Sequence, residues 1–382
     1  MILFFTIFFT VYGAVNYYIF IRGWQAISFL SYLKPFYIII FLTASLSYIL
    51  ARFLSSILPP LLYDIMLWIG SFWFAFILYF FLFLVFIDIL RLSNSLINFF
   101  PSFITNNYNL TKLITLLCVI VLSSSIILSG YLNTRKIVVN NVTIELPKKS
   151  GRIGELNAVL VADFHLTPVN DGKLLSKIVD KINELKPDIV LMPGDIVDDN
   201  VSILKERNIG TGLAGIKSRL GVYASNGNHE FISGVEEADK FIEENRIKVL
   251  RDSVELINSS FYLIGREDRS ISSFTNKERK PLNEIMKEVN DAFPVIILDH
   301  TPSGLDEVVY SKIDLQLSGH THHGQMFPLN LITNMVYEVS WGYLKKGNTQ
   351  FYVTCGVGTW GPPVRLGSDS EIINLKIRFV DR

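Results

Sequence analysis

Half of the histidines in this chain fall within one short stretch. The sequence of 382 residues has 6 His, and His320, His322 and His323 stand together in SGHTHHGQ. The other three each stand beside or near an Asp, Asn or Glu: His165, His229 and His300. Imidazole and carboxylate together are ligands for borderline divalent metals such as Zn, Mn or Fe. The pattern therefore predicts a metal site rather than a chance grouping of histidines.

Charge and composition narrow the class of protein. The formal net charge is +0, with a sequence pI near 7.0, so nucleic acid is not expected as a partner. Hydrophobic residues make up 50% of the chain, with a mean hydropathy of +0.36, which is high for a soluble protein. The excess lies before about residue 132. The two cysteines, Cys118 and Cys355, do not form a disulfide framework.

The first third of the chain is typical of a transmembrane α-helical bundle. We expect about four helices over residues 1–132, because a span needs roughly 20 apolar residues. A cleaved signal peptide is the alternative for the first, but no charged segment precedes it and further spans follow. The apolar runs cover residues 2–21, 35–54, 64–90 and 113–132.

The predicted spans carry no charged residue at their middle. Asp64 and Asp88 stand only at the ends of the third. Intramembrane ionisable groups usually mark a transport path, so their absence favours a membrane anchor over a transporter.

The character of the sequence changes after the last span. Residues 133–155 are predicted to form a linker and first strand, and residues 156–382 a catalytic α/β domain. Apolar residues at helical spacing predict a helix over 174–185, and short apolar runs predict buried strands in a largely parallel sheet. The strand segments cover residues 158–163, 188–193, 221–225, 294–298 and 314–318.

Each predicted strand leads into a metal-ligating residue type. Ligands in open α/β sheets bind outside the carboxyl ends of the strands, so we expect the clusters to converge on one edge. Gly194, Gly227 and Gly319 precede a ligand each time and would allow sharp turns or close backbone approach. The clusters are Asp163 with His165, Asp195, Asn228 with His229, Asp299 with His300, and His320 with His322.

The order D-x-H, G-D-x-x-D, G-N-H-E, H and G-H-x-H resembles the calcineurin-like metallophosphoesterase superfamily. The resemblance runs from about Val159 to the C-terminus and is closer to the YkuE-type branch, through GDIVDD, GHTHHGQ and the glycine-rich GVGTWGPPVRLGSDSEI. It implies a four-layer α/β/β/α sandwich. Two positions depart from the pattern: Ala162 replaces a usual Ser, and His323 stands where Gly is usual.

The resemblance also implies roles for individual residues. Two divalent ions, Mn, Fe or Zn, would be the cofactors, with Asp195 bridging them. His229 would be the proton donor, oriented by Asp198. One ion would be held by Asp163, His165 and His322. The other would be held by Asn228, His300 and His320.

Several other residues carry weaker predictions. His323 is expected beside the ligands or the substrate, with a merely exposed loop histidine as the alternative. Arg365 could bind a phosphate, since guanidinium suits bidentate recognition, although a structural salt bridge is the commoner role. GREDRS, residues 265–270, is expected to be a solvated turn. Trp341 and Trp360 could line a pocket or touch the membrane, with core packing as the safer interpretation.

Together these features predict a multi-pass, membrane-anchored phosphoesterase that cleaves phosphomonoester, phosphodiester or diphosphate bonds. A non-catalytic metal-binding sensor or scaffold is the alternative, but it would not need His229 and Asp198. Its partners would be the lipid bilayer and a phosphoester substrate, with a lipid-linked one suggested by apolar residues 326–344. Short-loop Lys and Arg favour an extracytoplasmic catalytic domain. The oligomeric state stays open.

Overall fold

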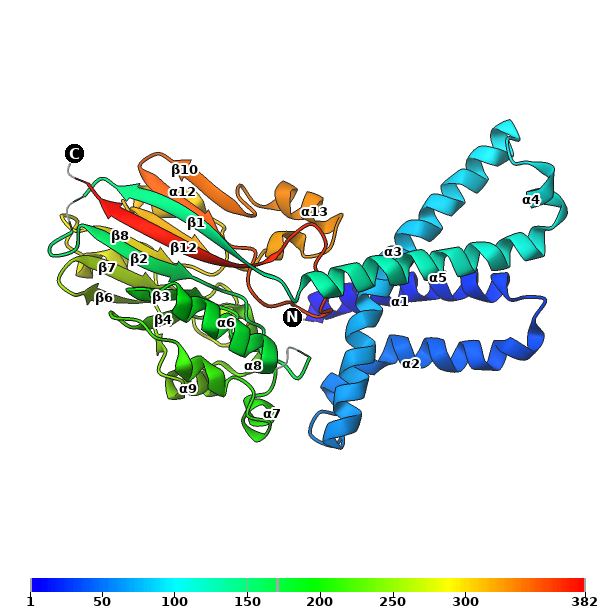
Figure 1. The fold of residues 1–382 in the computed structure, drawn as a ribbon, viewed down its shortest axis with the longest axis horizontal. Helices are drawn as coiled ribbons and strands as arrows, with labels where there is room; N and C mark the ends of the chain where they lie inside the picture. Colours follow the sequence, from blue (N-terminus) through cyan, green and yellow to red (C-terminus); the bar gives the residue numbers. More distant parts are fainter. Residues whose placement is uncertain (1, 149, 170–171, 381–382) are drawn as a thin grey trace. The chain divides into compact units, whose positions relative to one another are not determined.

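The chain forms two compact units (Figure 1). The computed structural model describes residues 2–148, 150–169 and 172–380. A helical unit comprises residues 1–131 together with 361–364, and an α/β unit comprises residues 132–360 and 365–382.

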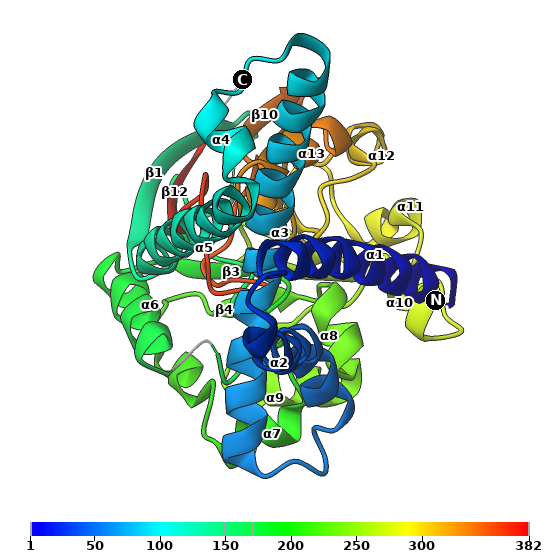
Figure 2. The ribbon, with the colours of Figure 1, turned by 90° about the vertical axis from the view of Figure 1, so that its right-hand side faces the viewer.

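The helical unit has a long helix at each of the four predicted spans. Figure 2 shows α3 running across α1 and α2. Within the described residues, three segments are long and apolar enough to cross a membrane: Ser31–Phe53, Pro60–Ile97 and Tyr108–Asn133. The side chains of residues 2–5 in the first helix lie outside the described part. The helices are α1 (Ile2–Ala26), η1 (Ser31–Leu33), α2 (Lys34–Phe53), α3 (Pro60–Ile97), α4 (Ser102–Asn106) and α5 (Tyr108–Asn133).

The α/β unit contains two six-stranded sheets. In the first sheet only the β12–β2 pair is antiparallel. In the second, β10–β11 and β6–β7 are antiparallel and the central pairs are parallel. The first sheet has the order β1 (Ile137–Leu146), β12 (Ser370–Phe379), β2 (Glu155–Leu160), β3 (Ile189–Pro193), β4 (Val222–Ser225) and β5 (Lys248–Val249). The second has the order β10 (Gly342–Lys346), β11 (Thr349–Val353), β9 (Leu315–Ser318), β8 (Val295–Leu298), β7 (Phe261–Gly265) and β6 (Ser253–Ile257).

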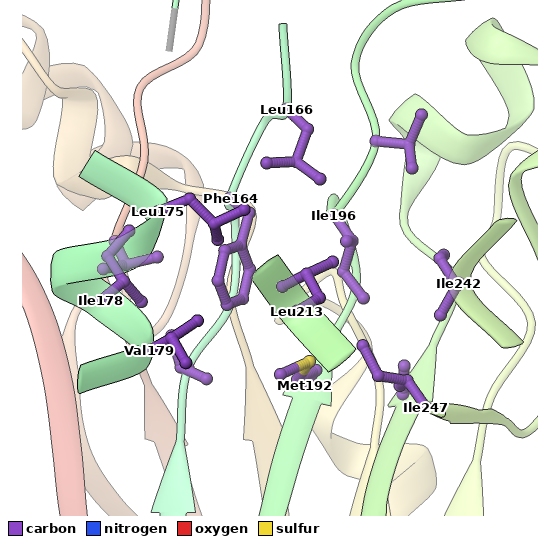
Figure 3. Close-up of a cluster of buried hydrophobic side chains, with 14 of the residues drawn as sticks. Phe164, Leu166, Leu175, Ile178, Val179, Met192, Ile196, Leu213, Ile242 and Ile247 are labelled. Carbon is purple, nitrogen blue, oxygen red and sulfur yellow. The ribbon is translucent and has the colours of Figure 1, made fainter. Parts of the chain in front are cut away.

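Three hydrophobic cores separate four layers, which confirms the predicted α/β/β/α sandwich. Alternate residues of β3 face opposite sides: Met192 packs with Ile178 beneath the outer helices, while Leu191 faces the core between the sheets. Figure 3 shows the outer core, with Ile178 beside the first sheet. Ile297 packs in the third core, beneath the helices of the second sheet.

The helices of the α/β unit include the one expected from helical spacing, α6. The longer helices are α6 (Gly172–Glu184), α9 (Val235–Glu244) and α13 (Leu329–Val336). The shorter ones are α7 (Val201–Glu206), η2 (Thr211–Gly215), α8 (Asn228–Ser233), α10 (Ile271–Phe274), α11 (Leu282–Ile285), η3 (Met286–Glu288), α12 (Leu305–Tyr310) and η4 (His322–Gly324).

All five predicted strands are present, but the single sheet edge expected for them is wrong. β2, β3 and β4 belong to the first sheet, whereas β8 and β9 belong to the second. An apolar run of four or five residues identifies a buried strand, but it does not say with which partner the strand pairs. The ligand-bearing loops therefore come from two sheets packed face to face.

Candidate metal centre

The ligand residues occupy strained backbone positions at the ends of the strands. Asp163, His165 and Asp195 have φ of 56°, 45° and 54°, a left-handed conformation that residues other than glycine seldom adopt. Hydrogen bonds between the strand ends hold it: Asp163 N donates to Gly194 O at 3.1 Å and His165 N to Asp195 O at 3.0 Å. The loops thus aim their side chains at one point instead of alternating across the sheet.

The SGHTHHGQ loop is a tight turn, as the two-residue spacing of its ligands requires. His320 and His322 have φ of 72° and 47°, and His322 begins the short helix η4. An extended segment would point these two side chains in opposite directions. The turn instead brings both to the centre.

Glycines before the ligands serve two different purposes. Gly194 has φ of 83° and makes the sharp turn that the sequence predicts. A Cβ on Gly227 would lie 2.2 Å from Asp195 Oδ1, and one on Gly319 would lie 2.4 Å from Asp163 Oδ2. These two glycines are therefore needed because a ligand carboxylate packs against the backbone.

The first group of donor atoms contains Asp163, His165 and His322. One ligand atom from each lies within 4.8 Å of the others, and all three residues are buried. His165 Nε2 is 2.9 Å from His322 Nε2, which in turn is 3.8 Å from Asp163 Oδ1. This is the set that the motif comparison assigns to one ion.

The second group contains Asp195, His300 and His320, again within 4.8 Å. His300 Nε2 lies 3.1 Å from Asp195 Oδ2 and 3.2 Å from His320 Nδ1. Asn228 joins this group through its amide oxygen, 3.0 Å from His320 Nδ1.

Asp195 lies between the two groups. Its Oδ2 is 3.1 Å from His300 Nε2 and 3.7 Å from His165 Nε2. Asp195 also forms a third group within 4.8 Å, with His165 and His229. One carboxylate therefore faces imidazoles from both sets, as a bridging ligand would.

The chemistry of the donor set fits divalent metal ions. Imidazole nitrogens face one another at hydrogen-bond distance in a buried site, where lone pairs without a shared cation repel. His300 Nδ1 lies 2.8 Å from Pro193 O, an acceptor, so Nδ1 carries the hydrogen and Nε2 directs its lone pair inward. The residues can thus hold the two ions that the motifs predict.

Burial and neighbouring charges shift the pKa values of the carboxyl groups of Asp163 and Asp195. Burial, opposed by His300 and aided by the charge of Asp195, raises the pKa of Asp163 to about 6. Burial would also raise the pKa of Asp195, but His300 and His229 hold it well below its usual range. Asp195 is therefore the carboxylate whose negative charge the protein itself stabilises.

His229 and Asp198 form a close pair beside the ligand groups. Asp198 Oδ1 lies 2.5 Å from His229 Nδ1, and its Oδ2 lies 3.3 Å from His165 Nδ1. Burial alone would lower the pKa of His229, but Asp198 and Asp195 raise it to about 9. The His229 ring also meets the Trp360 ring edge-on at 6.1 Å. One carboxylate thus fixes the orientation of two imidazoles.

Glu230 is a buried residue that fixes the backbone around Asp195, and the sequence did not predict this role. Its carboxylate accepts hydrogen bonds from the backbone N–H groups of Asp195 and Gly227, at 3.0 and 2.8 Å. It also accepts from Ile196 and Val197 at 2.7 and 2.9 Å. The signal was present in GNHE, because Glu at the third position of a helix commonly closes a capping box, here that of α8.

Arg365 is fully buried, and its guanidinium donates hydrogen bonds to backbone carbonyl groups. Nη2 donates to Cys355 O and Gly358 O, both at 2.7 Å, which engages its two hydrogens. The same nitrogen lies 3.3 Å from His322 Nδ1, so that contact is electrostatic. Burial and the charges of His165 and Arg365 hold the pKa of His322 well below its usual range. This geometry favours support of a ligand over the predicted contact with phosphate.

His323 lies outside the donor groups in the same loop. Its Nδ1 is 3.0 Å from Ser340 Oγ, and its ring lies 5.3 Å from that of Trp341. The residue is half-buried, and burial lowers its pKa. His323 therefore contributes a neutral imidazole to the surface beside the centre.

The segment GREDRS is not the solvated turn that we expected. Arg266, Glu267 and Asp268 are 2%, 4% and 3% exposed. Arg266 pairs with Asp252 and Glu267 with Arg251, while Asp268 accepts hydrogen bonds from Ser270 and Thr301. We call the resulting set the ion-pair cluster; it consists of Arg251, Arg266, Arg279, Asp239, Asp252, Glu267 and Asp299.

Comparison with known proteins agrees with the geometry. A family model for the calcineurin-like phosphoesterase domain matches residues 156–324. An uncharacterised metallophosphoesterase of Campylobacter jejuni is 31% identical over 279 residues, which cover 71% of this chain and 72% of that protein.

Two further relatives match over a smaller share of their own length. A transmembrane protein with metallophosphoesterase domain from Danio rerio is 32% identical over 257 residues, covering 62% of this chain and 57% of that protein. An uncharacterised metallophosphoesterase of Helicobacter pylori is 31% identical over 229 residues, covering 58% and 60% respectively. The chain thus spans less than two thirds of these two relatives. With the matched domain, the ordered motifs and the Campylobacter relative taken together, the chain belongs to the calcineurin-like metallophosphoesterase family.

Proposed function

We propose that the chain is a membrane-anchored, binuclear metal-dependent hydrolase of phosphoesters. The observation that carries the proposal is the sharing of Asp195 between two ligand groups, directly beside the His229–Asp198 pair. A sensor or scaffold would need the ligands alone. A buried imidazole held at 2.5 Å by a carboxylate is what a proton-transfer step requires, so the pair favours an enzyme.

The proposed ligand sets follow the geometry of the two groups. Asp163, His165 and His322 would hold one ion, Asn228, His300 and His320 would hold the other, and Asp195 would belong to both sites. Two such ions would supply Lewis acidity and an activated water for in-line displacement at phosphorus.

The remaining residues of the site orient the ligands and move a proton. His229 donates a proton to the leaving oxygen, while Asp198 holds the ring and its tautomer. Glu230 fixes the backbone on both sides of Asp195. Arg365 holds the glycine-rich tail next to His322 through hydrogen bonds to Cys355 O and Gly358 O. His323 offers a neutral hydrogen-bond donor or acceptor to the substrate.

Exposed apolar residues beside the site support an amphiphilic substrate. In α13 no residue is buried, and Met335 and Val336 are 78% and 66% exposed. Phe327 and Trp360 are 54% and 55% exposed. Core packing is therefore wrong for α13 and Trp360, but it holds for Met326 and Val339, which are buried. An acyl or prenyl chain attached to the phosphoester would cover such a surface.

The tether between the last span and the α/β unit also favours a lipid-linked substrate. Residues 133–155 were predicted to form a linker and first strand, and the linker is short, because α5 ends at Asn133 and β1 begins at Ile137. Confinement to a membrane raises the effective concentration of substrates that share that membrane.

We further propose that the α/β unit lies outside the cytoplasm. Arg22, Lys34, Arg91 and Lys112 lie just outside the apolar runs 2–21, 35–54, 64–90 and 113–132, near the connections between the helices, and basic residues there favour the cytoplasm. The opposite orientation, with the α/β unit in the cytoplasm, is favoured by the basic residues after the last span, Arg135, Lys136 and Lys148. Lys149 belongs to the same stretch but lies outside the described residues. Protease added to intact cells tests this orientation: cleavage of the domain is expected, and its protection would overturn the assignment.

A substrate panel on the solubilised full-length protein tests the proposed activity. Mn, Fe or Zn is added, and one phosphorylated headgroup is offered with and without its lipid tail. Hydrolysis that stops on chelation is expected, with a higher kcat/KM for the lipid form. No hydrolysis by metal-loaded protein would favour the sensor or scaffold. Hydrolysis with equal constants would retain the enzyme but remove the lipid substrate.

A further inference from the structure

The helical unit contains a half-open cavity of about 960 Å³. Its walls come from α1, α2, α3 and α5, and its body is lined by apolar and aromatic side chains such as Phe72, Phe76 and Val119. The lining residues of α3 extend from Trp68 to Arg91, about 35 Å at 1.5 Å per residue. One leaflet contributes about half of the roughly 30 Å hydrocarbon core of a bilayer, so an acyl chain that spans a leaflet fits within this length.

Charged residues gather where the cavity meets the connections between helices. Arg22, Arg91 and Lys112 line it together with Asp88, and the other lining residues are uncharged. Three cations and one anion leave a net charge of +2 at this place. Arg22 lies near the end of α1, Arg91 lies near the end of α3, and Lys112 lies in the first turns of α5. The charges thus gather at one end of the helices, where a lipid headgroup would lie.

The contacts of these side chains leave positive charge for a further partner. Asp88 accepts from Arg22, from Tyr18 OH at 2.7 Å and from Arg91 Nη1 at 3.1 Å. Its single negative charge is therefore shared between two guanidinium groups. Lys112 Nζ lies 5.1 Å from the Tyr108 ring centroid, and a cation–π contact uses none of its N–H donors.

We propose that this cavity binds one anionic phospholipid. Its phosphate lies between Arg91 and Lys112, and its acyl chains fill the apolar body. A small soluble anion could satisfy the charge but would leave the aromatic and aliphatic walls uncovered, which is why the occupant needs a tail. A zwitterionic lipid would fill the walls but would leave the net positive charge uncompensated.

Native mass spectrometry of the full-length protein tests the proposal. Delipidated protein is mixed with phosphatidylglycerol or with phosphatidylcholine of identical chains, and glycerol phosphate serves as the tailless competitor. We expect one phosphatidylglycerol per chain, bound about tenfold or more tightly than phosphatidylcholine. Equal binding of the two lipids, or displacement by glycerol phosphate at the same concentration, would overturn the proposal.

Variants separate the proposed site from general attraction to a basic surface. Arg91→Gln with Lys112→Gln should weaken phosphatidylglycerol binding about tenfold or more. Lys34→Gln is the matched control, because Lys34 is a basic residue at the start of α2 but lies over Trp24, 4.7 Å from the ring centroid, and does not line the cavity. An equal loss in the control would contradict the proposal.

A second variant keeps the test decisive if the charge variant fails to fold. Ala44→Trp narrows the apolar body and leaves all four charged groups in place. It should reduce phosphatidylglycerol binding while the protein keeps its monodisperse elution. Unchanged binding in this folded variant would show that the lipid lies elsewhere. Hydrolysis of a soluble phosphoester, measured in parallel, should not change in any of the variants.

Discussion

The α/β unit buries two groups of charged or ligating residues that follow opposite rules. In the metal centre, donor atoms such as His165 Nε2 and His322 Nε2 face one another at 2.9 Å. In the ion-pair cluster, acids face bases: Arg251 Nε lies 2.6 Å from Glu267 Oε2, and Arg279 pairs with Asp299. Buried charge needs a partner in both places. The cluster supplies its own partners, whereas the candidate metal centre groups donor atoms that could hold cations.

The two groups are close in sequence, which makes their difference informative. Asp299 belongs to the ion-pair cluster, and the next residue, His300, belongs to the metal centre. Neighbouring side chains on β8's exit loop thus serve stability and ligation separately. Substitutions should therefore separate metal content from folding stability.

The largest effect is expected from Asp195→Asn. The amide cannot carry the negative charge that faces both ligand groups, so we expect loss of bound metal and a fall in rate beyond the 10²–10⁴-fold typical of a proton donor. Elemental analysis and steady-state rates measure the two effects. Asp180→Asn, an exposed change on α6, is the control and should keep both. Full metal content with normal rate in Asp195→Asn would contradict the bridging role.

His229→Gln should lower the rate by about 10²–10⁴-fold while metal content stays near two ions per chain. The loss should be greatest for poor leaving groups, because these depend on proton donation. An activated nitrophenyl ester should recover much of the rate. If the variant loses its metal, or keeps full rate on a poor leaving group, the proton-donor assignment is wrong.

Arg279→Met should act on folding stability rather than on chemistry. Removing the guanidinium leaves Asp299, 3% exposed at its side chain, without its cation, and breaking a buried pair costs about 3–5 kcal/mol. Adding Asp299→Leu removes the stranded charge and should restore much of the unfolding free energy. Chemical denaturation of the detergent-solubilised protein measures both. A double variant no more stable than the single one would show that the pair is not the relevant interaction.

The smallest expected effect concerns pH. Burial, opposed by Arg251 and aided by Glu267, raises the pKa of Asp239 to about 6. Because the folded pKa exceeds the unfolded value of 3.8, stability is complete below about pH 4 and falls as pH rises through 6. Asp239→Asn should remove this pH-dependent change in the free energy of unfolding, which is at most about 2–3 kcal/mol. The control Glu244→Gln, also on α9, changes an exposed acid. Parallel Tm–pH profiles for both variants would contradict the prediction.

The sequence alone identified most of the residues that the structure brings together. Motif order selected Asp163, Asp195 and His320, and short apolar runs located the strands that precede them. These features are local: a buried strand and the ligand after it are a few residues apart, so periodicity and residue type suffice. The four-layer architecture came from the resemblance and is confirmed by the three cores.

Tertiary structure decided which polar residues are buried and what faces them. Glu230 binds backbone groups more than 30 residues away, Arg365 holds the tail against His322, and Arg266, Glu267 and Asp268 of GREDRS lie in the interior. The apolar side chains of α13 are exposed, and the predicted strands belong to two different sheets. Burial and charge pairing depend on contacts between distant segments. Residue types and motif order therefore predicted a metal site, while the packing of two sheets decided which charges pair with one another and which donor atoms are grouped where they could hold metal.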